Sequence, residues 1–64
     1  MIRKAEVGED FNLFYKFYNG NSYEEIYVGS LYKAGEGWLF SPTLDNSVKF
    51  TQMMLYAIAD VMYA

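Results

Sequence analysis

The chain has 64 residues, no cysteine and no histidine, and eight acidic against five basic side chains give it a net charge of −3. One domain spanning residues 1–64 accounts for this length, and a domain of this size buries only about 60% of the surface that its unfolded form exposes. These counts exclude a disulfide, a Ser-His or Cys-His pair and a zinc site, and the acidic balance argues against binding to nucleic acid or anionic lipid.

Such a small domain needs an aromatic core, a partner, or both. The chain contains seven Tyr, five Phe and one Trp, and such rings bury large areas at low entropic cost. No apolar run approaches the 18 residues of a membrane span, and no apolar segment follows Arg3 and Lys4 as it would in a secretion signal. Because the absence of cysteine fits a reducing compartment, we expect a cytoplasmic protein.

The first segment, residues 1–10, is compatible with a flexible tail or with a short edge strand. Ile2 and Val7 could pair onto the edge of a sheet, whereas Gly8, Glu9 and Asp10 are typical of a turn or a solvated lead-in. The pattern leaves both alternatives open.

Residues 11–41 predict a three-stranded antiparallel meander, with strands FNLFYKFY, YEEIYVGSLY and WLFS joined by NGNS and KAGEG. A turn at Gly20-Asn21 would place Lys16 opposite Glu25, and a turn at Asn19-Gly20 would slip the pairing by two residues. Both choices keep every side chain on the same face, because the side-chain period of a strand is two. The first face of the first strand comprises Phe11, Leu13, Tyr15 and Phe17, and the second comprises Asn12, Phe14, Lys16 and Tyr18.

Strict alternation in the second strand assigns Ile26, Val28 and Tyr32 to the first face. It assigns Tyr23, Glu25, Tyr27 and Leu31 to the second face. Gly29 in mid-strand indicates a bulge or room for a bulky neighbour. If Tyr32 lies opposite Trp38, then Trp38 and Phe40 also join the first face, and a one-residue bulge at this turn would reverse them.

The segment 45–63 predicts a C-terminal helix after Pro42 has ended the last strand. Four residues could serve as its N-cap, namely Thr43, Asp45, Asn46 and Ser47. The apolar stripe of this helix consists of Phe50, Met53, Met54, Ala57, Ile58 and Val61. The expected fold is therefore α+β, a βββα arrangement with one helix packed across the first face of the sheet.

A second apolar row, Val48, Leu55 and Met62, repeats along the helix flank at seven-residue spacing. Either the core wraps around the edge of the sheet or this flank forms the interface of a homodimer. The small size of the domain favours the homodimer.

One helix cannot cover both faces of a sheet, so the aromatic second face predicts an interaction surface. We expect another protein to contact Phe14, Tyr18, Tyr23 and Tyr27, with Glu24 and Glu25 at the rim. The alternatives are a solvated face of good strand formers, a stacking surface for single-stranded nucleic acid, and a structural subunit of a larger assembly. The stacking surface lacks positive charge, because Lys16 is the basic residue on that face and Glu25 lies opposite it.

Enzymatic activity is not expected, and the chain predicts no catalytic residue, no cofactor and no metal site. The paired carboxylates Glu9-Asp10 and Glu24-Glu25 are sequence neighbours, and neighbours in a strand point to opposite faces. Glu25 is expected to pair with Lys16 across the hairpin, in a contact worth less than about 1 kcal/mol. The stretch GEG at 35–37 is typical of a hairpin turn.

The run from Ile26-Tyr27-Val28-Gly29 through Gly37-Trp38-Leu39-Phe40-Ser41-Pro42 into a helix resembles small accessory proteins of lambda-like phages. Some of these place VG on one strand, then GW and an aliphatic-Phe pair, and then a terminal helix. The resemblance covers about half of the chain and carries no functional residues over. It implies a protein that binds a host protein in the bacterial cytoplasm, as inhibitors of host defence nucleases of similar size and charge do.

Overall fold

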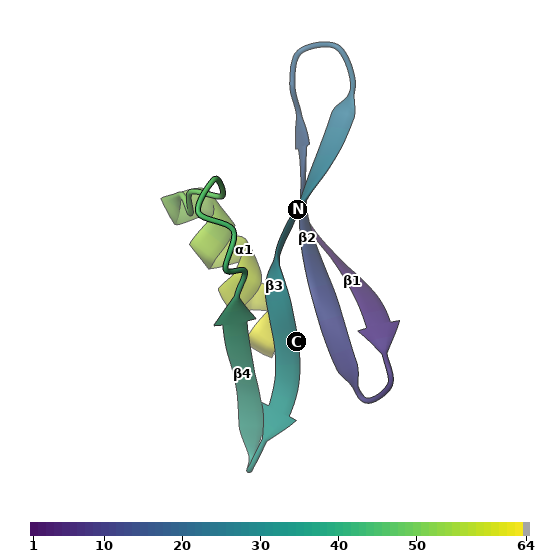
Figure 1. The fold of residues 1–64 in the computed structure, drawn as a ribbon, viewed down its shortest axis with the longest axis vertical. Coiled ribbons are helices and arrows are strands. Elements are labelled where there is room, and N and C mark those ends of the chain that lie inside the picture. Colours follow the sequence, from purple (N-terminus) through teal and green to yellow (C-terminus); the bar gives the residue numbers. More distant parts are fainter. Residues whose placement is uncertain (64) are drawn as a thin grey trace.

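The computed structural model describes residues 1–63, which form a four-stranded antiparallel sheet and one helix (Figure 1). The strands are ordered β1-β2-β3-β4 across the sheet, as in the chain. The elements are β1 (Ile2–Val7), β2 (Asp10–Tyr18), β3 (Tyr23–Ala34), β4 (Gly37–Pro42) and α1 (Gln52–Tyr63). The predicted α+β class is confirmed, and the prediction of three strands is one strand short.

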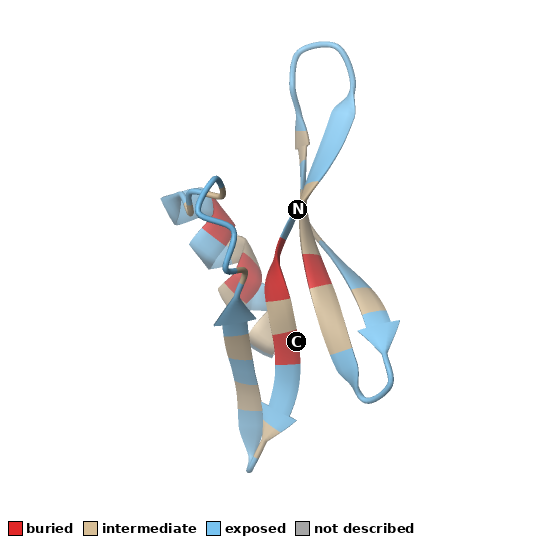
Figure 2. Ribbon diagram, viewed as in Figure 1, coloured by how far each residue is buried: buried red, intermediate tan, exposed pale blue. Residues whose placement is uncertain are grey.

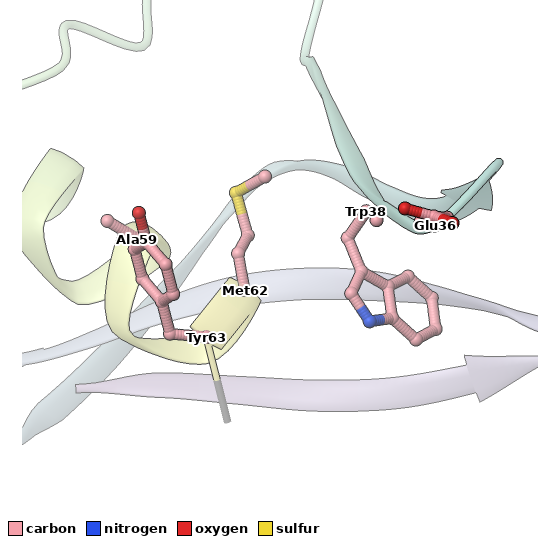
Figure 3. A pocket seen from close by; sticks show the side chains of 6 residues that line it. Glu36, Trp38, Ala59, Met62 and Tyr63 are labelled. Carbon is pink, nitrogen blue, oxygen red and sulfur yellow. The ribbon is translucent and has the colours of Figure 1, made fainter.

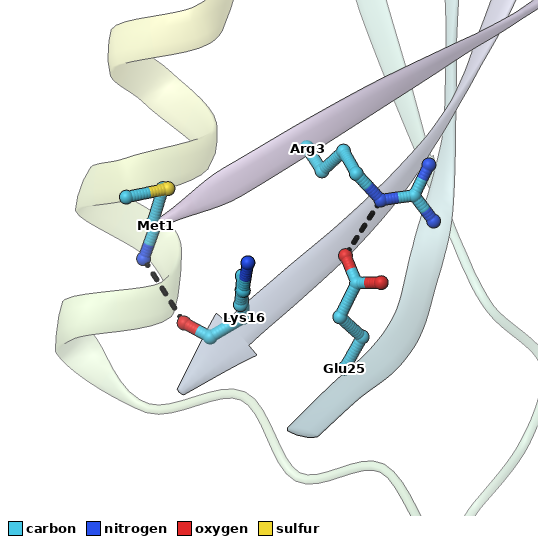
Figure 4. Close-up of polar contacts among 4 residues, drawn as sticks. All are labelled: Met1, Arg3, Lys16 and Glu25. Atoms are coloured by element: carbon cyan, nitrogen blue, oxygen red, sulfur yellow. Dashed lines mark hydrogen bonds and ion pairs between the residues drawn. The ribbon is translucent and has the colours of Figure 1, made fainter. Parts of the chain in front are cut away.

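The additional strand is β1, so most of residues 1–10 adopt the edge-strand alternative. Val7 pairs with Asp10 around a two-residue turn in which Gly8 has φ 64°, as a type II′ hairpin turn requires at its first central position. At the other end, the Lys16 N–H donates to the Met1 carbonyl at 2.7 Å, and the Met1 ammonium donates to the Lys16 carbonyl at 3.3 Å (Figure 4). These contacts hold the N-terminus against β2.

A β-bulge in β3 changes which of its residues face the helix. Leu13 pairs with Gly29 and Phe14 pairs with Tyr27, so Val28 is the extra residue. The prediction that Leu31 lies on the second face is therefore wrong, because Leu31 is only 2% exposed and belongs to the core. The prediction that Tyr32 lies on the first face is wrong for the same reason. The bulge that Gly29 indicated is confirmed.

The side chains of β4 lie on the predicted faces, although the predicted pairing between β3 and β4 is wrong. Trp38 lies opposite Lys33 and Phe40 lies opposite Leu31, whereas Tyr32 lies opposite Leu39 instead of Trp38. The bulge and the turn each shift the register by one residue. Since the two shifts cancel, Trp38 and Phe40 remain on the first face, where they pack against the core.

The helix begins at Gln52 rather than at residue 45, because Thr51 is its N-cap. The Thr51 hydroxyl accepts a hydrogen bond from the Met54 N–H at 3.2 Å, and the Thr51 carbonyl accepts one from the Leu55 N–H at 3.1 Å. The four predicted N-caps instead lie in the preceding loop. There the Asp45 carboxylate accepts bonds from the Ser47 N–H at 2.9 Å and the Ser47 hydroxyl at 2.7 Å, which lower the pKa of Asp45.

We expect the substitution Thr51→Ala to lower the free energy of unfolding by about 1 kcal/mol, since it removes the side-chain acceptor of the Met54 N–H. Urea unfolding followed by the helical circular dichroism signal measures this change. Thr51→Ser keeps the hydroxyl and should restore most of the loss. Equal losses for the two variants would show that the hydroxyl does not cap the helix.

The core lies between the first face of the sheet and α1 (Figure 2). Its helical members are Met54 and Ile58, at 4% and 3% exposure, whereas Met53 of the predicted stripe is exposed and Phe50 precedes the helix. A half-buried shell surrounds this core and includes a tilted aromatic pair, Phe11 with Trp38, and an edge-to-face pair, Phe40 with Phe50. The buried set is Leu13, Val28, Leu31, Met54 and Ile58. Among residues 1–63, no helix has the length and apolar character needed to cross a membrane.

Candidate interaction surface

The side of the sheet away from α1 carries a row of aromatic and aliphatic side chains, which we call the tyrosine face. It extends over β2, β3 and β4, and most of its members are exposed. Tyr23 and Tyr18 are the most exposed of its rings, at 68% and 59%. The tyrosine face consists of Phe14, Tyr18, Tyr23, Tyr27, Tyr32 and Leu39. Four of these are the predicted contact residues, and Tyr32 is an addition that strict alternation missed because of the bulge.

Two edge-to-face aromatic pairs form the outer half of this face. Tyr18 lies directly opposite Tyr23, with ring centroids 5.3 Å apart, and Phe14 lies opposite Tyr27 at 5.6 Å. The hairpin that carries Tyr18 and Tyr23 extends beyond the rest of the molecule (Figure 1). Such pairs are worth about 0.5–1.5 kcal/mol beyond their buried area, and they orient the rings against each other.

A short polar network separates the outer rings from Tyr32 and Leu39. The Ser30 hydroxyl donates to the Asn12 Oδ1 atom at 3.1 Å and lies 2.8 Å from the Tyr27 hydroxyl. Because the Ser30 proton is used toward Asn12, the Tyr27 hydroxyl is the donor to Ser30. The network therefore gives the Tyr27 hydroxyl a hydrogen-bond partner on the face itself.

The charges on this face contact its rings. The Arg3 guanidinium lies 4.5 Å from the Phe14 ring centroid, and the Lys16 Nζ atom lies 5.2 Å from that of Tyr23. Lys16 is opposite Glu25, as predicted, but the Glu25 carboxylate pairs instead with Arg3 at 2.6 Å (Figure 4). Both side chains are substantially exposed, so this ion pair is worth less than about 1 kcal/mol. Arg3 was missed because the pattern of residues 1–10 did not specify a strand.

The second predicted rim residue, Glu24, belongs to the other face. It lies opposite Phe17, and Phe17 stacks on Tyr15 with centroids 6.2 Å apart on the side that carries the core. Of the two glutamates, Glu25 alone is therefore next to the tyrosine face. Residues 23–27, between the hairpin turn and the bulge, alternate regularly, so the neighbours Glu24 and Glu25 point to opposite faces.

The predicted dimer flank is not one surface of a helix. Val48 precedes α1 and packs against the core together with Met62, whereas Leu55 is 53% exposed. Since the helix begins at Gln52, Val48 does not share a helical flank with the other two residues. Self-association itself stays a prediction.

Two hollows lie on the side of the sheet that faces the helix. The first lies between the turn after β3 and the last turn of α1, and Glu36 is its one charged residue (Figure 3). The second is an apolar groove beside the start of the helix, lined by Tyr15, Phe17, Ile26, Thr51, Met53 and Met54. Neither brings together the convergent polar groups of a small-molecule site. Within residues 1–63, no three His, Cys, Asp or Glu side chains gather as metal ligands.

Comparison with known proteins found no match for this chain among protein-family models, curated proteins or solved structures.

Proposed function

We propose that this chain is a small, non-enzymatic protein-binding module that contacts another protein through the tyrosine face. The observation that carries the proposal is that five aromatic rings and a leucine share one side of the sheet, which α1 leaves uncovered. Exposed apolar surface of this kind is typical of interaction sites, and tyrosine supplies rigid contact area with a polar tip.

The polar surroundings of the rings favour a protein partner over single-stranded nucleic acid. A stacking site for nucleic acid needs cations that are free to meet phosphates. Here Arg3 is paired with Glu25 and covers Phe14, so one of the two cations on the outer half of the face is already neutralised. The remaining aromatic surface suits the apolar centre of a protein interface.

The biological setting of the proposal is the bacterial cytoplasm, where the protein would act as a homodimer. In that setting it would occupy a site on a host protein, as a phage-encoded inhibitor or modulator of, for example, a defence nuclease. The support for this setting is the resemblance of residues 26–42 to phage accessory proteins, together with the small size and acidic charge of the chain.

The proposal predicts that the double substitution Tyr18→Ser and Tyr23→Ser weakens partner binding by about 30-fold or more without unfolding the protein. Neither ring belongs to the core, and loss of principal contact residues costs about 2 kcal/mol or more, which is about 30-fold in affinity. The measurement is quantitative pull-down from a bacterial lysate, followed by titration of the captured protein.

The matched control is Tyr56→Ser with Tyr63→Ser, which removes two tyrosines of α1 that are 60% and 92% exposed. This control should retain the partner. A partner that both double variants retain equally would refute the assignment of the tyrosine face. Filter binding of single-stranded RNA at low salt tests the alternative, and retention that depends on Tyr18 and Tyr23 would replace a protein partner with a nucleic acid.

A further inference from the structure

The two borders of the sheet differ in how they are protected. Border strands expose unpaired backbone groups, and proteins commonly block them with charged side chains or proline. Strand β1 carries Arg3, Lys4 and Glu6, whereas the β4 sequence GWLFSP carries no charge and has one proline at its end. Figure 1 shows β4 at the border of the sheet next to β3. The β4 border is therefore the one open to another strand.

The hydrogen-bond pattern identifies which backbone groups of β4 are free. The Thr43 N–H donates to the Val28 carbonyl at 2.9 Å, which marks this opposing pair as hydrogen-bonded. Since such pairs alternate along an antiparallel ladder, the N–H and C=O groups of Trp38 and Phe40 point away from β3. Within residues 1–63, no loop or side chain makes a hydrogen bond to these groups.

We infer that β4 pairs in antiparallel fashion with β4 of a second copy of this chain, with Leu39 on the twofold axis. In this register Trp38 of one copy lies opposite Phe40 of the other, so both free N–H groups meet a carbonyl of the facing strand. A register centred on Phe40 would instead place Trp38 opposite Pro42, which has no N–H, so the Trp38 carbonyl would lack a donor from the facing strand. The register centred on Leu39 therefore pairs both the N–H and the C=O groups of Trp38 and Phe40.

The side chains fit the same register. Leu39 is 49% exposed on the tyrosine face, and the axis brings it against Leu39 of the second copy. No charge lies between Gly37 and Pro42, so the pairing places no like charges opposite one another. A second copy suits this strand because the interface is self-complementary, as twofold symmetry requires.

The assembly closes at two copies because the remaining borders are the charged β1 strands. Both helices lie on one side of the joined sheet, and the two tyrosine faces become continuous on the other side across Leu39 and Tyr32. This interface deepens the self-association proposed above and rests on it, but it needs no partner protein to form.

Cysteine crosslinking tests the interface, since the chain has no cysteine of its own. Across a pair without hydrogen bonds the Cα atoms are about 4.5 Å apart, within disulfide range. We expect Leu39→Cys to form a disulfide-linked dimer on mild oxidation, as seen on non-reducing gels. Ser41→Cys is the matched control on the same strand and face, because the proposed register separates the two copies of residue 41 by about 13 Å. Its crosslinked fraction should be several-fold lower.

Light scattering on a sizing column provides an independent test. The native chain should elute with twice the mass of one chain, and Leu39→Lys, which places two like charges on the axis, should elute with the mass of one. A native chain that is monomeric at several hundred micromolar would overturn both the interface and self-association. A native dimer in which Leu39→Cys crosslinks no better than Ser41→Cys would overturn this interface alone, and so would a Leu39→Lys variant that remains dimeric. Neither test involves Tyr18 or Tyr23, so failure here is distinguishable from failure of the tyrosine face to bind a partner.

Discussion

Substitution of Gly29 by alanine should lower the free energy of unfolding by more than about 3 kcal/mol. A Cβ atom at this position would lie 2.3 Å from the Ser41 carbonyl oxygen and 2.9 Å from the nearest atom of the Phe40 ring. The contact with Ser41 is to backbone, so relief requires β4 to move away from β3. In addition, Gly29 has φ 148°, a conformation that costs other residues about 1–3 kcal/mol.

The sum of these costs, more than about 3 kcal/mol, is comparable to the whole stability of a domain of this size, about 3–10 kcal/mol. Urea and thermal unfolding measure it. Gly37→Ala is the control, because a Cβ atom there meets nothing within 4 Å and φ lies outside the range that favours glycine. A Gly29→Ala variant as stable as Gly37→Ala would mean that the bulge and the close approach of Phe40 are absent.

The second large effect is expected at Leu31, where the substitution Leu31→Ala should cost about 2–5 kcal/mol of unfolding free energy. The Leu31 side chain is 2% exposed and packs with Leu13, Val28, Met54 and Ile58. Truncation removes buried methyl groups and leaves a cavity that a small, tightly packed core cannot fill by collapse.

The neighbouring residue supplies the control for Leu31. Tyr32 is 39% exposed on the tyrosine face, so Tyr32→Ala should cost less than about 1 kcal/mol. Strict alternation through β3 predicts the reverse order, with Tyr32 inside and Leu31 outside. Comparing the urea midpoints of the two variants therefore tests the bulge. A larger loss of stability for Tyr32→Ala than for Leu31→Ala would mean that β3 is a regular strand without a bulge.

The predictions that agreed with the structure depend on local patterns. Alternation from Phe11 to Tyr18 is strict, so Leu13 and Phe14 fall on their predicted faces, and the turn at Gly20-Asn21 places Lys16 opposite Glu25. Four of the predicted contact residues accordingly share the tyrosine face. A strand side chain has only two possible directions, so a regular strand reveals its faces without any knowledge of its neighbours.

The errors arose where the local sequence allows more than one structure and contacts with distant residues determine which one forms. Residues 1–10 could be a tail or a strand, and pairing of Ile2 with Tyr15 and of Arg3 with Phe14 selects the strand. Thr43, Asp45, Asn46 and Ser47 all have good capping side chains, yet Thr51 caps the helix. Capping propensity differs little among these residue types, so the packing of Met54 and Ile58 on the sheet decides where the helix begins.

Local patterns in the sequence specify the class of the fold and an aromatic side of the sheet that the helix leaves uncovered, and at Gly29 they indicate either a bulge or room for a bulky neighbour. These features follow from short-range rules: side chains alternate between faces along a strand, glycine adopts conformations that other residues avoid, and one helix can cover only one face of a sheet. Contacts between the strands place Leu31 inside and Tyr32 outside, pair Arg3 rather than Lys16 with Glu25, and make β1 a border strand of the sheet. These outcomes depend on the register between strands, and a shift of one residue there reverses every side chain beyond it.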